Sequence, residues 1–162
     1  MPQHAAPLLV ERLPFTQALA GSTPLRLPLD ADQRTSLRGH RRSACGHDLV
    51  LQLPRGTALQ PGELLCSQDG SLLVQVEAAA EPVMEVRSAD PLALLQAAYH
   101  LGNRHVAMEL HVDRLVLLQD SVLADLLRQR GLKVELRELP FQPEAGAYEG
   151  LGHHHGDHGH HH

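Results

Sequence analysis

The sequence predicts an α+β fold with three parts: a small all-β N-terminal domain, a ferredoxin-like βαββαβ domain and a disordered His-rich tail. Residues 1–82 consist of short apolar runs separated by Gly and Pro, which is typical of strands joined by turns. Residues 83–146 switch between strand and helix periodicity in the order β-α-β-β-α-β. Residues 147–162 have no periodicity and contain seven of the 13 histidines, so we expect a flexible tail.

The first domain is expected to hold about six short strands. Four of them are read directly from apolar runs, at residues 8–10, 25–27, 49–53 and 72–76. The pair Asp69-Gly70 suits a tight hairpin turn. Residues 32–42 are polar and rich in arginine, and we interpret them as a solvated loop or a sheet edge. A binding surface for an acidic partner is the alternative for this segment.

The second domain begins with a strand at residues 83–87 and a helix at residues 91–101. Asp90 is a good N-cap, and Pro91 suits the first helical position. The apolar face is read as the set Leu92, Leu94, Leu95, Ala98, Tyr99 and Leu101. Gly102 is expected to end this helix in the left-handed conformation. A strand at residues 104–110 would follow, with His105 at its start and facing away from the apolar side.

The rest of the second domain is predicted in the same way. A strand at residues 115–118 leads to a helix that starts at Asp120 or Ser121 and ends at Gly131. A final strand spans residues 133–137. Two helices would then cover one face of a four-stranded antiparallel sheet. The other face must meet solvent, the first domain or a second subunit.

Composition excludes several functions. The formal net charge of −5 argues against a general nucleic-acid or membrane-surface binder. No apolar run approaches the ~20 residues of a membrane span, and the N-terminus lacks the pattern of a signal peptide. Cys45 and Cys66 are widely spaced and are read as free thiols of a cytoplasmic protein. The chain has no HExxH, GxSxG or P-loop motif, so no enzyme activity is expected.

Histidine is the residue type that points to a function. Imidazole suits Ni, Cu and Zn, and a flexible segment dense in histidine offers several ligands to one ion. An engineered purification tag is the competing interpretation of the C-terminus. The run is interrupted by Gly156, Asp157 and Gly159, which favours a native metal-binding tail. His105 adds one imidazole on a rigid element, while His100, at the end of the helix, is interpreted as structural.

Several separate motifs occur in one order along nearly the whole chain. They are YHLGNRH at residues 99–105, DSVLADLLRQRG at 120–131, LPFQPEAGAY at 139–148, and LPRG at 53–56 followed by GELL at 62–65. Together with the His-rich C-terminus, they resemble the UreE family of urease accessory proteins, which are nickel metallochaperones.

The resemblance implies a metal site and an assembly. His105 would be the central nickel ligand of a homodimer formed through the second domain, with one ion between the two copies. Tail histidines would complete its coordination, namely His153, His154, His155, His158, His160, His161 and His162. Some family members carry further histidines just before the second helix, but residues 117–121 contain none here. His111 is a weaker candidate for such a role.

The resemblance also implies a biological role. The protein would deliver Ni(II) for assembly of the urease active site in the cytoplasm, with Zn(II) or Cu(II) as competitors. Its partners would be the GTPase UreG and the urease apoprotein complex, and a dimer of dimers around a metal ion is one expected assembly. The first domain would be a peptide-binding module. Two alternatives stay open: a general nickel, copper or zinc buffer or storage protein, and a structural peptide-binding protein whose histidines come from a tag.

Overall fold

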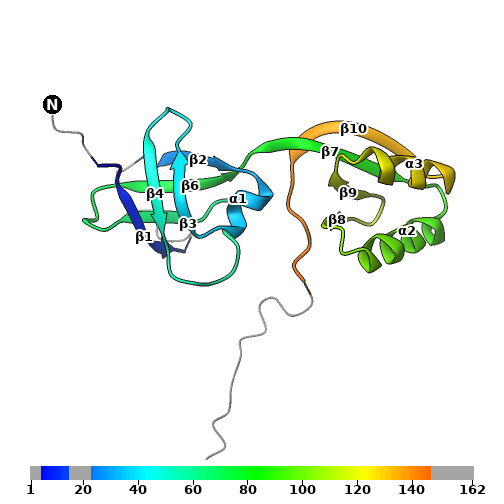
Figure 1. Cartoon of the computed structure of the whole chain (residues 1–162), viewed down its shortest axis with the longest axis horizontal. Helices are drawn as coiled ribbons and strands as arrows, with labels where there is room; N and C mark the ends of the chain where they lie inside the picture. Colours follow the sequence, from blue (N-terminus) through cyan, green and yellow to red (C-terminus); the bar gives the residue numbers. More distant parts are fainter. Residues whose placement is uncertain (1–4, 15–22, 147–162) are drawn as a thin grey trace, which may run out of the picture.

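The computed structural model describes residues 5–14 and 23–146, and these form two sheets joined by a long two-stranded ribbon (Figure 1). The first sheet has the strand order β2-β6-β5-β1-β4-β3. Its strands are β1 (Leu8–Leu13), β2 (Leu25–Leu29), β3 (Arg38–Arg42), β4 (Asp48–Gln52), β5 (Leu64–Ser67) and β6 (Leu73–Ala78). The four strands expected from apolar runs are present, and the structure adds β3 and β5.

The first domain is held together by a core made almost entirely of leucine and valine. Leu9, Leu27, Leu51 and Val76 are each at most 1% exposed and belong to one cluster. The expected turn at Asp69-Gly70 is confirmed, because it joins the antiparallel pair β5 and β6, and Gly70 has a positive φ of 74°. A residue without a side chain takes this backbone conformation at little steric cost.

Residues 32–42 differ from the expectation of a solvated loop. Helix α1 (Ala31–Thr35) begins at Asp30, whose side chain accepts a hydrogen bond from the Gln33 backbone N–H in a capping box. The prediction of an all-β domain is therefore wrong at this helix. Arg34 is only 4% exposed, so it is not a solvated arginine. The other expectation, a sheet edge, is confirmed, since β3 is the last strand of the sheet.

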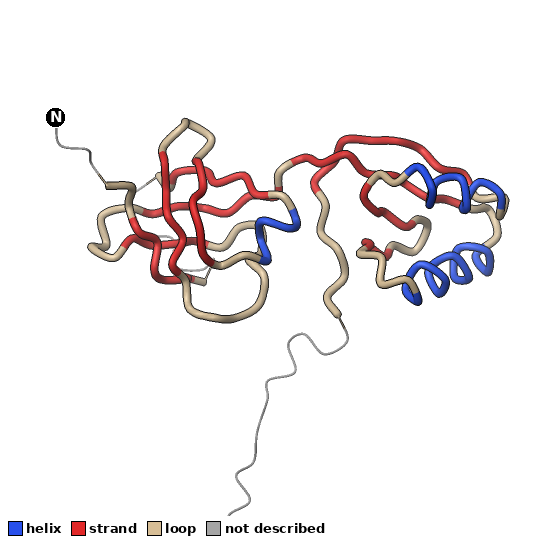
Figure 2. The backbone as a smooth tube through the Cα atoms, viewed as in Figure 1, coloured by secondary structure: helices blue, strands red, loops and turns tan. Residues whose placement is uncertain are grey.

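The second sheet has the strand order β10-β7-β9-β8, and every neighbouring pair is antiparallel. Its strands are β7 (Ala80–Arg87), β8 (Met108–Leu110), β9 (Leu115–Leu118) and β10 (Lys133–Pro140), with helices α2 (Pro91–Asn103) and α3 (Ser121–Gln129). The chain thus runs β-α-β-β-α-β here, as expected. Both helices pack on the same side of this sheet, and the core lies between them and the strands (Figure 2).

Helix α2 buries only part of the apolar face that was expected, since Leu94, Ala98 and Leu101 pack on the core. Asp90 is its N-cap, as predicted, and its side chain accepts from the Leu92 backbone N–H at 3.0 Å. The buried residues are Leu94, Ala97 and Leu101. Leu92, Leu95 and Tyr99, which the sequence placed on the core side, are 58%, 68% and 67% exposed. The helix is therefore apolar on two faces, of which only one packs against its own sheet.

The opposite face of the second sheet is covered in part by Phe141, which directly follows β10. Phe141 is 1% exposed and packs against Val83 and Val116, with Ala31 of α1 and Leu139 at the edge of the cluster. This cluster contains residues of both domains, so it forms the joint between them. Of the three possibilities left open for this face, the first domain accounts for the part around Phe141.

Strands β7 and β10 form the ribbon between the domains. They pair over eight residues, from Lys133 opposite Arg87 to Pro140 opposite Ala80. Strand β7 follows β6 after Ala79, so the chain passes from one sheet into the other almost without a loop. None of the described helices is both long enough and apolar enough to cross a bilayer.

Candidate metal centre

His105 lies in the turn that ends helix α2, and not in a strand as expected. Strand β8 starts only at Met108. The backbone N–H of His105 donates to the Gly102 carbonyl at 3.0 Å, and that of Val106 donates to the Leu101 carbonyl at 3.1 Å. These two hydrogen bonds define a Schellman motif with Arg104 as the C-cap and His105 as the next residue.

The backbone of His105 is left-handed, with φ of 56°, the only positive φ outside glycine among the described residues. The prediction that Gly102 takes this conformation is wrong, because the motif places it three residues later. Helix α3 ends in the same motif: Gly131 has φ of 82°, and the Leu132 N–H donates to the Leu127 carbonyl at 3.0 Å. The left-handed region costs a side-chain-bearing residue about 1–2 kcal/mol, which glycine avoids.

Replacing His105 by glycine should therefore stabilise the fold. We expect His105→Gly to raise the free energy of unfolding by about 0.5–1 kcal/mol, since the relief of left-handed strain exceeds the added entropy of the unfolded chain. Gly131→Ala is the matched change in the opposite direction and should lower it by about 1 kcal/mol. Urea unfolding of the metal-free chains measures both. A destabilised His105→Gly variant would show that the imidazole contributes more to the fold than its backbone costs.

The surroundings of His105 suit a cation. The side chain is exposed, and it follows directly on the C-terminal end of a 13-residue helix, where the helix dipole is negative. His100 lies one turn before the end of the same helix, with its ring edge-on to Tyr99 at 5.5 Å between centroids. This contact agrees with a packing role for His100. The backbone thus presents His105 to solvent at a helix end.

His111 lies just beyond β8 and is held by Glu109. The Nε2 atom of His111 is 2.9 Å from Glu109 Oε2, and the histidine backbone N–H donates to the Arg114 carbonyl at 3.0 Å. The other carboxylate oxygen, Glu109 Oε1, accepts from the Gln142 backbone N–H at 2.7 Å. Both oxygens of Glu109 are therefore engaged. His111 is an exposed turn histidine with one carboxylate partner.

Within residues 5–14 and 23–146, no three side chains of His, Cys, Asp or Glu come close enough together to hold a metal ion. His40 of β3 pairs with Asp48 at 3.1 Å, and Cys45 is exposed with its sulfur 3.2 Å from the Ser43 hydroxyl. The seven tail histidines predicted as ligands lie outside the described residues. The described part of one chain therefore contains no metal site built from three such side chains.

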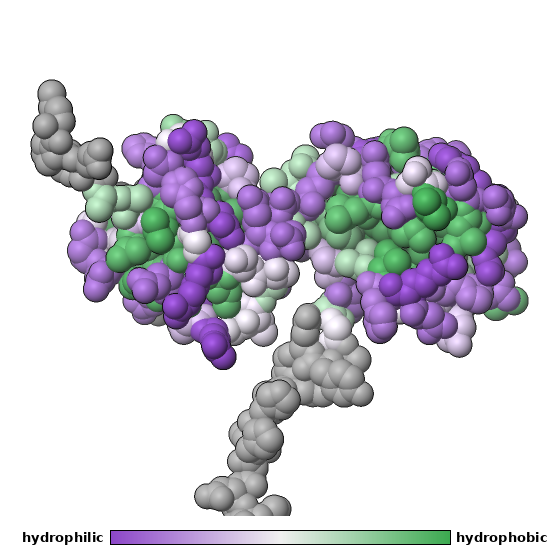
Figure 3. Space-filling model, in the orientation of Figure 1, coloured by the Kyte–Doolittle hydropathy of each residue, from purple (hydrophilic) through white to green (hydrophobic). Residues whose placement is uncertain are grey.

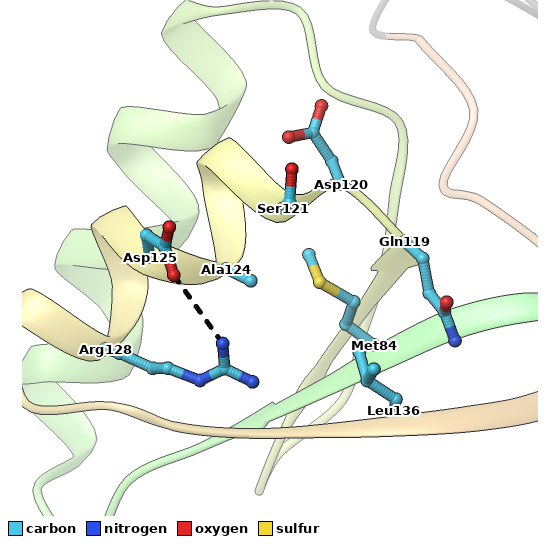
Figure 4. A pocket seen from close by; sticks show the side chains of 8 residues that line it. All are labelled: Met84, Gln119, Asp120, Ser121, Ala124, Asp125, Arg128 and Leu136. Carbon is cyan, nitrogen blue, oxygen red and sulfur yellow. Dashed lines mark ion pairs between the residues drawn. The ribbon is translucent and has the colours of Figure 1, made fainter.

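A pocket between α3 and the ribbon contains no imidazole or thiol (Figure 4). Its lining consists of Met84, Gln119, Asp120, Ser121, Ala124, Asp125, Arg128 and Leu136. Asp125 and Arg128 form an ion pair at 3.7 Å across one side. Gln119 and Ser121 lie where α3 begins, in the segment 117–121 that contains no histidine. Their side chains do not supply strong ligands for nickel.

Comparison with known proteins first defines the class. Residues 10–79 match the family model described as UreE urease accessory protein, N-terminal domain, and residues 81–162 match the corresponding C-terminal domain. Both matches describe an accessory protein of urease. The chain belongs to the UreE family, as its motifs indicated.

Individual relatives agree with this assignment. The urease accessory protein UreE of Parasynechococcus marenigrum (strain WH8102) is 53% identical over 139 residues, covering 86% of this chain and 91% of the relative. That of Synechococcus sp. (strain CC9311) is 58% identical over 124 residues, covering 76% and 80%. That of Cupriavidus necator is 48% identical over 155 residues, covering 96% and 74%.

Proposed function

We propose that this protein is a nickel metallochaperone that delivers Ni(II) during assembly of the urease active site. One ion would be bound between two subunits by His105, with tail histidines as further ligands. The observation that carries the proposal is the exposed His105 in a left-handed backbone conformation at the end of α2. A side chain kept at a strained position without a packing role is a mark of a functional residue.

The homodimer is supported by the second apolar face of α2. Leu92, Leu95 and Tyr99 recur at helical spacing on this exposed face, and Tyr99 lies within the last two turns before His105. Figure 3 shows that apolar residues also gather on the visible side of the second domain. Exposed apolar patches of this kind mark interfaces. A two-fold axis near the end of α2 would bring the two copies of His105 together and turn one ligand into two.

The tail would add ligands to this pair. Nickel takes four to six ligands, and two imidazoles from His105 leave positions that the tail histidines can fill. Zn(II) and Cu(II) compete because imidazole also suits them. Affinity should fall as pH decreases through the imidazole range, since a protonated histidine does not coordinate. An exposed site suits transfer of the ion better than permanent storage.

The remaining assignments follow from the family. We infer cytoplasmic action together with the GTPase UreG and the urease apoprotein, a peptide-binding role for residues 1–82, and metal binding and dimerisation through residues 83–146. The strand order β10-β7-β9-β8 supports a ferredoxin-like arrangement for this second domain. Two dimers sharing a metal ion would be the next level of assembly.

The experiment that tests the function combines metal titration with reconstitution. Nickel titration by calorimetry, with molecular mass measured in parallel and with zinc and copper alongside, gives the stoichiometry and preference. Urease activation is then measured with the other accessory proteins, with and without the nickel-loaded chain. Delivery requires activation at nickel concentrations where free nickel alone is ineffective. Tight binding without activation would instead support the buffer or storage alternative.

Deleting residues 153–162 should separate the two kinds of ligand. We expect the truncated chain to keep about one nickel ion per dimer through His105 and to lose the additional ions, because only the fixed imidazoles remain. Calorimetry and native mass spectrometry measure the number of ions. An unchanged number of ions after truncation would show that the tail is not part of the proposed site. A total loss of binding would show that His105 is not the primary ligand.

A further inference from the structure

The segment after β10 runs between the two domains and past β8 (Figure 1). It begins with Phe141, whose side chain is buried against the second sheet. Residues 141–144, which we call the strap, then lead toward the histidine-rich tail. Backbone that only connects a strand to the following segment has no need of such contacts. The strap is held by both domains through hydrogen bonds to its main chain.

The first domain holds the strap through Arg34. One end of this guanidinium, Nη1, donates to the Leu29 carbonyl at 2.8 Å, and the other, Nη2, donates to the carbonyl of Phe141. Arg34 is 4% exposed, and burial lowers its pKa, opposed by the charges of Glu81 and Asp30. Glu81 also accepts from the Ala31 N–H at 2.8 Å, so α1 is fixed to the ribbon that carries the strap.

The second domain holds the strap through β8. Glu109 Oε1 accepts from the Gln142 backbone N–H at 2.7 Å, and the Met108 carbonyl accepts from the Glu144 backbone N–H at 2.8 Å. Met108 is only three residues beyond His105, which is at most about 10 Å of chain. Glu144 therefore lies beside the start of β8, which follows His105 after two residues, and the described structure ends two residues later at Gly146.

We propose that the strap fixes the point from which the tail departs, beside His105, and that Arg34 and Glu109 are its positioning residues. The inference deepens the proposed function and rests on it where tail histidines are taken as ligands. It gives the first domain a part in the metal site, since a buried side chain of α1 determines where the tail begins. Neither Arg34 nor Glu109 contacts the metal in this proposal.

The expected size of the effect follows from chain length. With the strap in place, His153 is nine residues from Glu144, where the strap ends, and without the strap it is 13 residues from Pro140, where β10 ends. Effective concentration falls with about the −3/2 power of length, which gives about a twofold loss from length alone. Moving the point of departure from β8 to the end of β10 adds to this loss.

A metal-free measurement tests the position of the tail. A nitroxide is attached to Gly152→Cys in the full chain carrying Cys45→Ser and Cys66→Ser, and broadening of amide NMR signals is recorded. We expect strong broadening at residues 104–110, and a fall by at least about half in Arg34→Met and in Glu109→Ala. Arg41→Met is the matched control, because Arg41 donates to the His40, Gln33 and Ser36 carbonyls and not to the strap.

The outcomes are distinct. Even broadening over the whole protein, or broadening at 104–110 that persists in both variants, would overturn the proposal. Arg34→Met removes the donor of the Phe141 carbonyl, whereas the Leu29 carbonyl keeps the Ala79 backbone N–H at 2.9 Å. It is the variant at risk of misfolding, because it leaves a carbonyl unpaired at a buried position. Glu109→Ala, on the partly exposed β8, then carries the test. Because no metal is present, failure of the proposed nickel function would not affect this result.

Nickel affinity provides a readout that a purely structural role would not change. Arg34→Met and Glu109→Ala should weaken nickel binding about twofold or more in the full chain, but leave it unchanged in the chain lacking residues 153–162. An equal loss with and without the tail would mean that the two residues act on general stability, and would count against the proposal.

Discussion

His105→Ala should abolish tight nickel binding at the subunit interface while leaving fold and dimer intact. The substitution removes both fixed imidazoles of the proposed site at once, because the two-fold axis repeats it. Loss of second-shell partners alone costs about 10–100-fold in metal affinity, so loss of these ligands should cost at least about 100-fold. Alanine takes the left-handed turn with much the same strain as histidine, so stability should change little. Calorimetric titration of the first ion measures the effect.

Two other histidines of the second domain are matched controls. His100→Ala removes an imidazole from the last turn of α2, and His111→Ala removes the one paired with Glu109. Both should bind the first nickel ion as the wild type does. His105→Gly should lose binding like His105→Ala but gain stability, which separates the metal role from any folding role. First-ion affinity equal to wild type in His105→Ala would disprove the assignment.

The helix ends illustrate what the sequence predicts and where it misleads. Asp90 and Asp120 are N-caps and Gly131 ends α3, as expected. An Asp side chain accepts hydrogen bonds from the first turn of a helix, and glycine takes the left-handed conformation after the last turn at little cost. Gly102 was misleading because glycine is only one signal of a Schellman motif. The other signal is an apolar pair five residues apart, present as Leu101 and Val106 and again as Leu127 and Leu132. Ending the helix at Gly102 would have placed Asn103 in the apolar position.

The contacts that join the two domains could not be predicted from local sequence patterns. Residues 32–42 look solvated because arginine is rarely buried. The burial of Arg34 depends on the Phe141 carbonyl, which is 107 residues away in the sequence. No periodicity within α1 indicates such a partner. The candidate site is a different case, because the left-handed backbone of His105 is accompanied by a local signal, the apolar pair Leu101 and Val106.

The two apolar faces of α2 were also indistinguishable in the sequence. One face carries Leu94, Ala97 and Leu101, and the other carries Leu92, Leu95 and Tyr99. Hydrophobic periodicity identifies an apolar stripe but does not say whether it packs within the chain or against another. The structure resolves this by burying the first set. The exposed set is then the feature that most directly supports self-association.

Leu95→Glu should convert the proposed dimer into a monomer at micromolar concentrations. Leu95 is 68% exposed in the single chain and lies between Leu92 and Tyr99 along the stripe. A central apolar contact contributes about 2 kcal/mol or more to an interface. The two-fold axis places the substitution in both subunits, so the free energy of dimerisation should weaken by about 4 kcal/mol and the dissociation constant should rise about 1,000-fold. Analytical ultracentrifugation of the metal-free chain measures the dissociation constant.

Val122→Glu is the matched control, because Val122 is 71% exposed on α3 and lies outside the stripe. It should leave the dimer intact. Nickel affinity of Leu95→Glu should be low at dilute protein and recover as protein concentration rises, since the shared site forms only when two chains meet. A Leu95→Glu chain that stays dimeric would place the interface elsewhere. A monomeric one that still binds nickel tightly would show that one chain completes the site, and sharing of His105 between subunits would be wrong.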